Sequence, residues 1–101
     1  MNSKASEYDL KKLIADAVEE FEEVRRDHAG DLWDLATEIA DSNVPVYTYE
    51  LAQWGAHNVN ELMLAEPDIG PAFDGAPTPT NIIAANIYEA IYNRLAGLIN
   101  V

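Results

Sequence analysis

Carboxylates at helical spacing are the residues of this chain that could do chemistry or bind a partner. Between Asp16 and Asp41 the sequence places ten acids against two bases, Arg25 and Arg26. Acids in such numbers serve either as a catalytic or metal site or as a charged surface for a partner. The ten are Asp16, Glu19, Glu20, Glu22, Glu23, Asp27, Asp31, Asp34, Glu38 and Asp41.

Catalysis and metal binding are not the expected roles of these acids. A di-metal site in a helical bundle needs inward-facing acids and a Glu-x-x-His motif, but neither His28 nor His57 has an acid three residues before it. The acids oppose the apolar face of their predicted helices, whereas an active site is a concave apolar pocket. The sequence has neither a serine nucleophile motif nor a glycine-rich phosphate loop. We therefore expect no enzyme activity, no metal ion and no cofactor.

Composition and charge narrow the classes of partner. The chain has 101 residues, an apolar fraction of 49%, no cysteine and a net charge of −12. That length and apolar fraction fit one globular domain spanning residues 1–101. Six bases against eighteen acids disfavour nucleic acid and membranes as partners. Because no apolar run is long enough to cross a bilayer and the N-terminus is unlike a signal peptide, a cytoplasmic protein is expected.

Two amphipathic helices are expected to carry the acids. Apolar residues recur every three or four positions from Leu10 to Val24, which predicts one long helix. Ser6 is expected to cap its N-terminus, and Gly30 is expected to follow its end. Asp31 is expected to cap a second helix, which ends before the proline of the next connection.

The rest of the chain is predicted to contain two short helices, a loop and a buried helix. The short helices are expected at 48–57 and 61–65. The segment 66–79 holds four of the five prolines, so it is expected to be a loop. The last helix begins at Pro79 and is apolar nearly all round, so it must be buried centrally or against a partner. The predicted fold class is all-α, a small elongated helical domain.

Most of the large aromatic residues are expected to lie in the core. Two tryptophans differ: Trp33 falls beside the acidic face of the second helix, and Trp54 lies on a helix too short to bury it alone. Trp54 is therefore predicted to make a dimer contact, since aromatic residues are enriched at interfaces. The others are Tyr47, Tyr49, Tyr88 and Tyr92.

The spacing of the acids suits a surface that imitates DNA as well as it suits an ordinary solvated helix face. Exposed helices usually carry Glu–Lys pairs four residues apart, and repulsion between like charges costs a few tenths of a kcal/mol per pair. Acids three or four residues apart on a helix lie ~5–6 Å apart, so two or three such faces approach the one charge per ~1.7 Å of duplex DNA. An ordinary solvated helix face is the alternative. The acidic stripe, as we call the acids predicted to mimic phosphates, consists of Asp16, Glu19, Glu20, Glu23, Asp27, Asp31, Asp34, Glu38 and Asp41.

Two segments of the chain resemble the Ocr family of phage anti-restriction proteins. Asp31-Leu-x-Asp34, followed at 40–47 by Ala-Asp-Ser-Asn-Val-Pro-Val-Tyr, is similar to the central segment of that family. The segment Ala-Asn-Ile-Tyr-Glu at 85–89 is similar to a later one, and a connector containing proline and glycine separates the two in both. The resemblance covers roughly residues 31–95, and the chain is less acidic overall than the family.

The resemblance implies a mostly helical, elongated homodimer whose acids imitate the phosphates of bent B-form DNA. The implied partner is a host DNA-binding defence protein, a type I restriction–modification enzyme or a related system, in the cytoplasm of the infected host cell. Asp31, Asp34 and Asp41 are the acids carried over by matched position. The alternative is an acidic helical adaptor that binds one host protein through its apolar last helix or its proline-rich loop, including other anti-defence roles such as anti-CRISPR.

Overall fold

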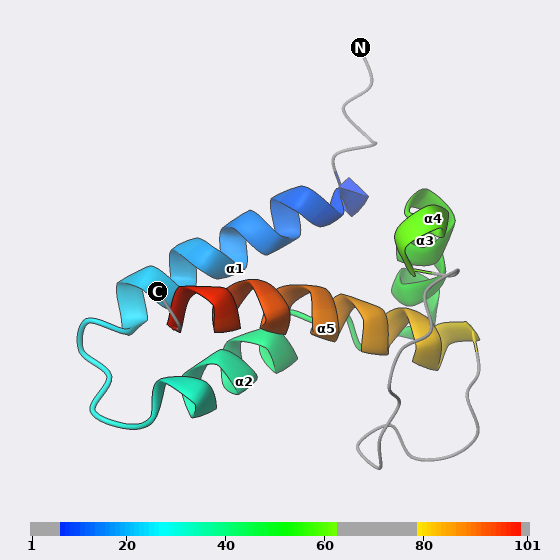
Figure 1. Cartoon of the computed structure of the whole chain (residues 1–101). Helices are drawn as coiled ribbons and strands as arrows, with labels where there is room; N and C mark the ends of the chain where they lie inside the picture. Colours follow the sequence, from blue (N-terminus) through cyan, green and yellow to red (C-terminus); the bar gives the residue numbers. More distant parts are fainter. Residues whose placement is uncertain (1–6, 63–78, 100–101) are drawn as a thin grey trace.

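The computed structural model describes residues 7–62 and 79–99, which form helices and the connections between them (Figure 1). The helices are α1 (Leu10–Val24), α2 (Leu32–Ser42), α3 (Thr48–His57), α4 (Val59–Leu62) and α5 (Pro79–Ile99). No strand occurs in that part of the chain, so the predicted all-α class is confirmed. The predicted loop 66–79 lies outside the described residues except for Pro79, the first residue of α5.

Helix α5 is the centre of the molecule. It packs against each of the other helices, with α1 and α2 along its length and α3 and α4 beside its N-terminal half (Figure 1). Its side chains Ile87, Ile91 and Leu95 are fully buried within one chain. Of the two expected placements, central or against a partner, α5 has the central one. Phe21 of α1 and Leu35 of α2 complete the core around them. Each such buried side chain stabilises the fold by about 1.5–3 kcal/mol.

Helix α1 differs at both ends from its prediction. Its N-cap is Asp9, whose Oδ1 accepts hydrogen bonds from the backbone N–H groups of Lys11 (3.0 Å) and Lys12 (3.4 Å), while the predicted cap Ser6 lies outside the described residues. The helix ends at Val24, well before Gly30. The reason is that the residues between these two positions include no apolar side chain large enough to pack on the core, and packing rather than propensity supports most protein helices.

The other predicted boundaries that fall on described residues largely agree with the structure. Asp31 caps α2, and its Oδ1 accepts a hydrogen bond of 2.9 Å from the backbone N–H of Trp33. Helix α2 ends at Ser42, before the proline of the next connection. Helix α3 spans Thr48–His57 as predicted, and Pro79 begins α5.

Two buried asparagines fasten the short elements to the rest of the fold. Asn58 Nδ2 donates to the carbonyl oxygens of Tyr8 (2.8 Å) and Trp54 (3.0 Å), which ties the N-terminal turn to α3. Asn86 Nδ2 donates to the carbonyl oxygen of Leu62 at 2.6 Å, which ties α5 to α4. Helix α4 begins two residues earlier than its prediction because the carbonyl of Asn58 accepts from Glu61 (3.1 Å) and Leu62 (2.8 Å).

Candidate acidic interaction surface

Every residue of the acidic stripe is exposed. Successive residues of a helix are rotated by about 100°, so Glu19 and Glu23 lie on the side of α1 opposite the buried Phe21 and its neighbours. Asp34, Glu38 and Asp41 lie opposite the face that α2 buries. Both helices therefore place apolar residues on the core and carboxylates toward solvent.

Three acids of the stripe are held by contacts within the chain. Asp16 Oδ2 lies 3.1 Å from Lys12 Nζ, in an exposed ion pair. Glu20 Oε1 accepts a hydrogen bond of 3.4 Å from Asn43 Nδ2. Asp31 uses a carboxylate oxygen to cap α2. These three carboxylates share their charge with groups of the protein itself, so they are less available to a partner.

The remaining acids of the stripe make no side-chain hydrogen bond or ion pair within residues 7–62 and 79–99. Helix α2 contains no lysine or arginine. Arg25 on the end of α1 pairs with Glu22, which is not in the stripe, at 3.8 Å. These acids face solvent without a cation of their own chain: Glu19, Glu23, Asp27, Asp34, Glu38 and Asp41.

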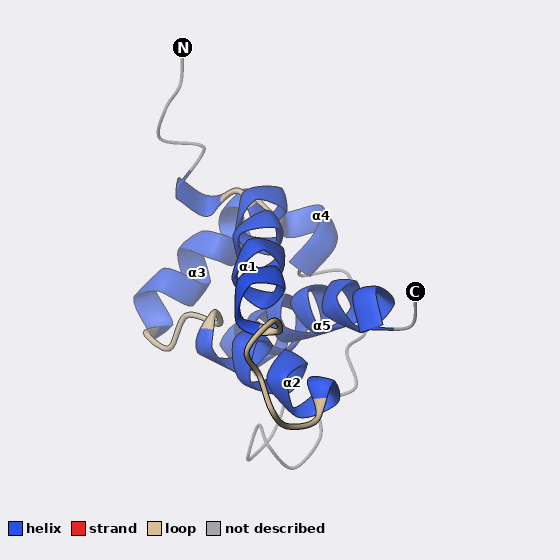
Figure 2. Cartoon of the chain, turned by 90° about the vertical axis from the view of Figure 1, so that its left-hand side faces the viewer, coloured by secondary structure: helices blue, strands red, loops and turns tan. Residues whose placement is uncertain are grey.

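The stripe continues from one helix to the other. The contact between Glu20 and Asn43 shows that the acidic flank of α1 adjoins the end of α2. At the other end, Asp27 and Asp31 lie in the connection between the two helices, which faces the viewer in Figure 2 with α1 and α2 on either side. The acids of the two helices are thus linked at two places, the Glu20–Asn43 contact and the connection that holds Asp27 and Asp31.

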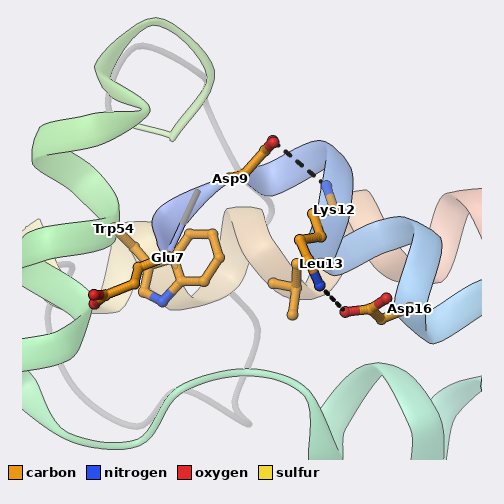
Figure 3. A pocket seen from close by; sticks show the side chains of 6 residues that line it. All are labelled: Glu7, Asp9, Lys12, Leu13, Asp16 and Trp54. Atoms are coloured by element: carbon orange, nitrogen blue, oxygen red, sulfur yellow. Dashed lines mark hydrogen bonds and ion pairs between the residues drawn. The ribbon is translucent and has the colours of Figure 1, made fainter. Parts of the chain in front are cut away.

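A shallow hollow of about 310 Å³ lies where α1 meets α3 (Figure 3). Two of its three carboxylates are already engaged, because Asp9 caps α1 and Asp16 pairs with Lys12. No group of three or more His, Asp or Glu side chains in the described part of the chain is arranged to hold a metal ion. The hollow therefore gives no support to proton transfer or metal chemistry. Its lining residues are Glu7, Asp9, Lys12, Leu13, Asp16 and Trp54.

The prediction that Trp54 needs a partner to bury it is corrected by the structure. Its indole is only 8% exposed within one chain. The ring of Tyr8 meets it edge-on, with the centroids 5.7 Å apart, and Tyr8 stacks on His57 at 4.8 Å. Tyr8 comes from a turn far away in the sequence, so the shortness of α3 did not decide the burial of Trp54. Little surface of Trp54 is left for a dimer contact.

Burial of the Tyr8 hydroxyl raises its pKa above 10, and the nearby Glu7, Tyr49 and Glu50 raise it further. The carboxylates act by repelling the phenolate, which carries the same charge. The neutral form of Tyr8 is therefore favoured in the folded protein.

Three large side chains around the start of α3 are largely exposed. Tyr47 and Tyr49 were predicted to be core aromatics, but they are 70% and 72% exposed, and Val46 is 80% exposed. Trp33 is 38% exposed and lies beside Tyr92, with the ring centroids 6.5 Å apart. The exposure of Tyr47 and Tyr49 could have been predicted from their position in the sequence. Both lie just after Pro45 at the start of a short helix, where the chain has not yet turned back onto the core.

None of the protein-family models, curated proteins or solved structures compared with the chain matches it. The resemblance to the Ocr family therefore stays a prediction. Both segments that suggested it have a role in the fold, since Val44 packs against the core and Ile87 is fully buried. Among the described residues, no helix is long and apolar enough to span a bilayer.

Proposed function

We propose that this protein is a DNA mimic that inhibits a host DNA-binding defence enzyme by occupying its DNA-binding groove. The observation that carries the proposal is the set of exposed carboxylates on α1 and α2 that no cation of the described chain neutralises. Arginine and lysine side chains that normally hold phosphates would hold these carboxylates instead. Inhibition would follow from occupancy, with release of counterions and without turnover.

The charge density of α1 supports the proposal. Four acids of the stripe, Asp16, Glu19, Glu20 and Glu23, occur within about 10 Å of helix axis. Duplex DNA carries about six charges over that length. Helix α2 is less dense, with Asp34, Glu38 and Asp41 over a similar length, but it has no base to offset them.

The length of the stripe favours two copies of the chain. Helix α1 has 15 residues and is about 22 Å long, which matches about six base pairs at about 3.4 Å each. A groove that grips a longer duplex would be filled by a homodimer that joins two stripes. Since Trp54 is buried, we assign the dimer contact to no particular residue.

The test is a competition assay against a type I restriction–modification enzyme bound to labelled duplex DNA, at about 50 mM and about 300 mM salt. The variant D34N/E38Q/D41N removes three acids of the stripe on α2. The matched control D9N/E22Q/E61Q removes three exposed acids outside the stripe, and Asp9→Asn keeps an oxygen that can cap α1. Both variants change the net charge by the same amount, so a difference between them reports position and not total charge.

A DNA mimic displaces the duplex at low salt and loses that ability as salt rises, because ionic contacts are screened. The stripe variant should compete about tenfold more weakly than the control variant, since three charge-assisted contacts are lost. Equal competition by the two variants would contradict the stripe. Absence of displacement at either salt concentration would exclude this enzyme class as the target.

An apolar hollow favours the adaptor as the second candidate function. It has a volume of about 350 Å³ and lies between α3 and the start of α5. An adaptor that docks a partner there would bind independently of salt, and its binding would fail on a single substitution of an exposed lining residue, such as Ala56→Glu or Val59→Glu. The hollow is lined by Ala52, Gly55, Ala56, Val59, Pro79, Thr80 and Ile83.

A further inference from the structure

A patch of large side chains lies exposed after the second acidic helix, α2, where the chain enters α3. Val46, Tyr47 and Tyr49 stand in the connection after α2 and in the first turn of α3, and most of each side chain faces solvent. Within the described residues neither tyrosine ring stacks on another ring, and neither hydroxyl makes a hydrogen bond. We call these three residues the tyrosine patch. Exposed aromatic residues of this kind mark interaction sites more often than ordinary surface.

The backbone under the patch is held in place. Tyr47 is the N-cap residue of α3, and its carbonyl accepts a hydrogen bond of 3.0 Å from the N–H of Leu51. On the other side, Asn43 Nδ2 donates to the carbonyl of Ile39 at 2.8 Å, and Val44 packs against the core. The rings therefore project from a fixed frame, so a partner would lose little conformational entropy when it orders them.

The surroundings of the patch decide what kind of partner fits it. Asp41 lies just before the connection and accepts a backbone hydrogen bond of 3.3 Å from Val44, while Glu50 is one helical turn from Tyr47. A second copy of this chain that docked with its own patch here would place the same acids opposite each other, so this patch does not suit the contact of a homodimer. The patch fits a cationic surface.

We propose that the tyrosine patch docks an arginine-rich segment of the basic protein that binds the acidic stripe. The guanidinium group is planar, stacks on aromatic faces and is more weakly hydrated than the ammonium group of lysine. The acids around the patch would then pair with the same guanidinium groups that the rings stack on. This proposal rests on the proposed function, because it places a second contact for the same partner beside the stripe.

The experiment compares nona-arginine with nona-lysine, which carry the same charge, by fluorescence anisotropy at about 50 mM salt. The proteins are the wild type, Y47A/Y49A, the control Y47F/Y49F and D34N/E38Q/D41N. Because Tyr47 and Tyr49 are exposed, Y47A/Y49A should keep the helical circular dichroism of the wild type. The quantity that matters is the ratio of the two peptide affinities in each protein, since carboxylates also distinguish arginine from lysine to some degree.

The ratio of the affinity for nona-arginine to that for nona-lysine should be lower in Y47A/Y49A than in the wild type. Each tyrosine that stacks on a guanidinium group should account for a two- to fivefold decrease, about 0.5–1 kcal/mol. Y47F/Y49F should keep the preference, because the ring and not the hydroxyl stacks. An unchanged ratio in Y47A/Y49A, or equal affinity of the wild type for both peptides, overturns the docking proposal. The stripe variant should bind both peptides more weakly at the same ratio. If the stripe variant binds both peptides as tightly as the wild type does, the proposed function fails. The tyrosine patch is tested separately, by the ratio of peptide affinities in Y47A/Y49A.

Discussion

Asp31 performs two tasks with one carboxylate. It caps α2 through the backbone N–H of Trp33, and it adds its charge to the acidic stripe. A negative charge at a helix N-terminus is favoured by the helix dipole, so both tasks act in the same direction. The cap fixes the start of α2 and thereby the direction in which Asp34, Glu38 and Asp41 point.

Substitutions at Asp31 should separate these two tasks. Asp31→Ala removes the cap and should lower the free energy of unfolding by about 1 kcal/mol. Asp31→Asn keeps an oxygen that accepts the hydrogen bond, so it should lose only the smaller contribution of the charge. Urea denaturation of both variants measures the difference. If the two variants are equally unstable, the side-chain hydrogen bond seen here does not contribute to stability.

Tyr8 gives the chain a pH dependence at the alkaline end. Its pKa in the folded protein is raised above the ordinary value of 10, by burial and by nearby Glu7, Tyr49 and Glu50. The unfolded chain releases this proton first as pH rises, so the stabilising contribution of neutral Tyr8 is complete below about pH 10 and is lost as pH climbs toward the folded pKa. In a pH titration, the tyrosinate absorbance of the wild type minus that of Y8F should show one phenol that ionises at a higher pH than a free tyrosine. A difference curve centred at the ordinary value would contradict the placement of Tyr8 against Trp54.

At the scale of the elements, α5 organises the fold. It contacts all of the other described helices, so a loss of packing along it affects each of them. Ile91→Ala should lower the free energy of unfolding by about 2–5 kcal/mol, because Ile91 is fully buried and its removal leaves a cavity. Asn93→Ala on the exposed side of the same helix should change it by less than about 0.5 kcal/mol. Thermal unfolding followed by circular dichroism compares them, and similar losses from both would mean that α5 is not buried as described.

The elements differ in how far the sequence determines them. The cap Asp31 and the first residue Pro79 were predicted correctly because both are local signals, read within three or four residues. The end of α1 at Val24 was missed because it depends on where packing against the core stops. The burial of Trp54 was missed for a similar reason, since it requires Tyr8, whose carbonyl is held by Asn58 fifty positions away in the sequence.

The candidate surface also has some features that the local sequence predicts and others that depend on tertiary packing. The exposed side of each acidic helix followed from periodicity, because apolar residues three and four apart fix the buried face. The exposure of Tyr47 and Tyr49 did not follow, because residue type favoured the core and only the path of the chain between α2 and α3 decides otherwise. Periodicity alone does not show which acids form hydrogen bonds or ion pairs within the chain. The hydrogen bond between Glu20 and Asn43 could not be predicted, because it depends on how α1 and α2 pack against each other.

At the scale of the whole molecule, the net charge of −12 acts against the fold. Several acids of the stripe lie three or four residues apart on one helix, such as Glu19 with Glu23 and Asp34 with Glu38. Each such pair lowers the free energy of unfolding by a few tenths of a kcal/mol. Removing the repulsion from several pairs together should therefore raise it by about 1 kcal/mol. Salt screens this repulsion, because the Debye length falls from about 30 Å to about 8 Å between 0.01 M and 0.15 M ionic strength.

Salt should therefore act with opposite sign on the free protein and on its complex. The Tm of the free protein should rise by several degrees over that range of salt, since about 1 kcal/mol corresponds to about 4–8 °C for a domain of this size. Binding to a basic partner should weaken over the same range. Calorimetry on the wild type, D34N/E38Q/D41N and D9N/E22Q/E61Q measures the first effect. The stripe variant should show the smaller rise in Tm because it removes more pairs of neighbouring charges. A Tm that is independent of salt in the wild type would mean that the acids are too far apart to repel. The density of charge on which DNA mimicry depends would then be missing.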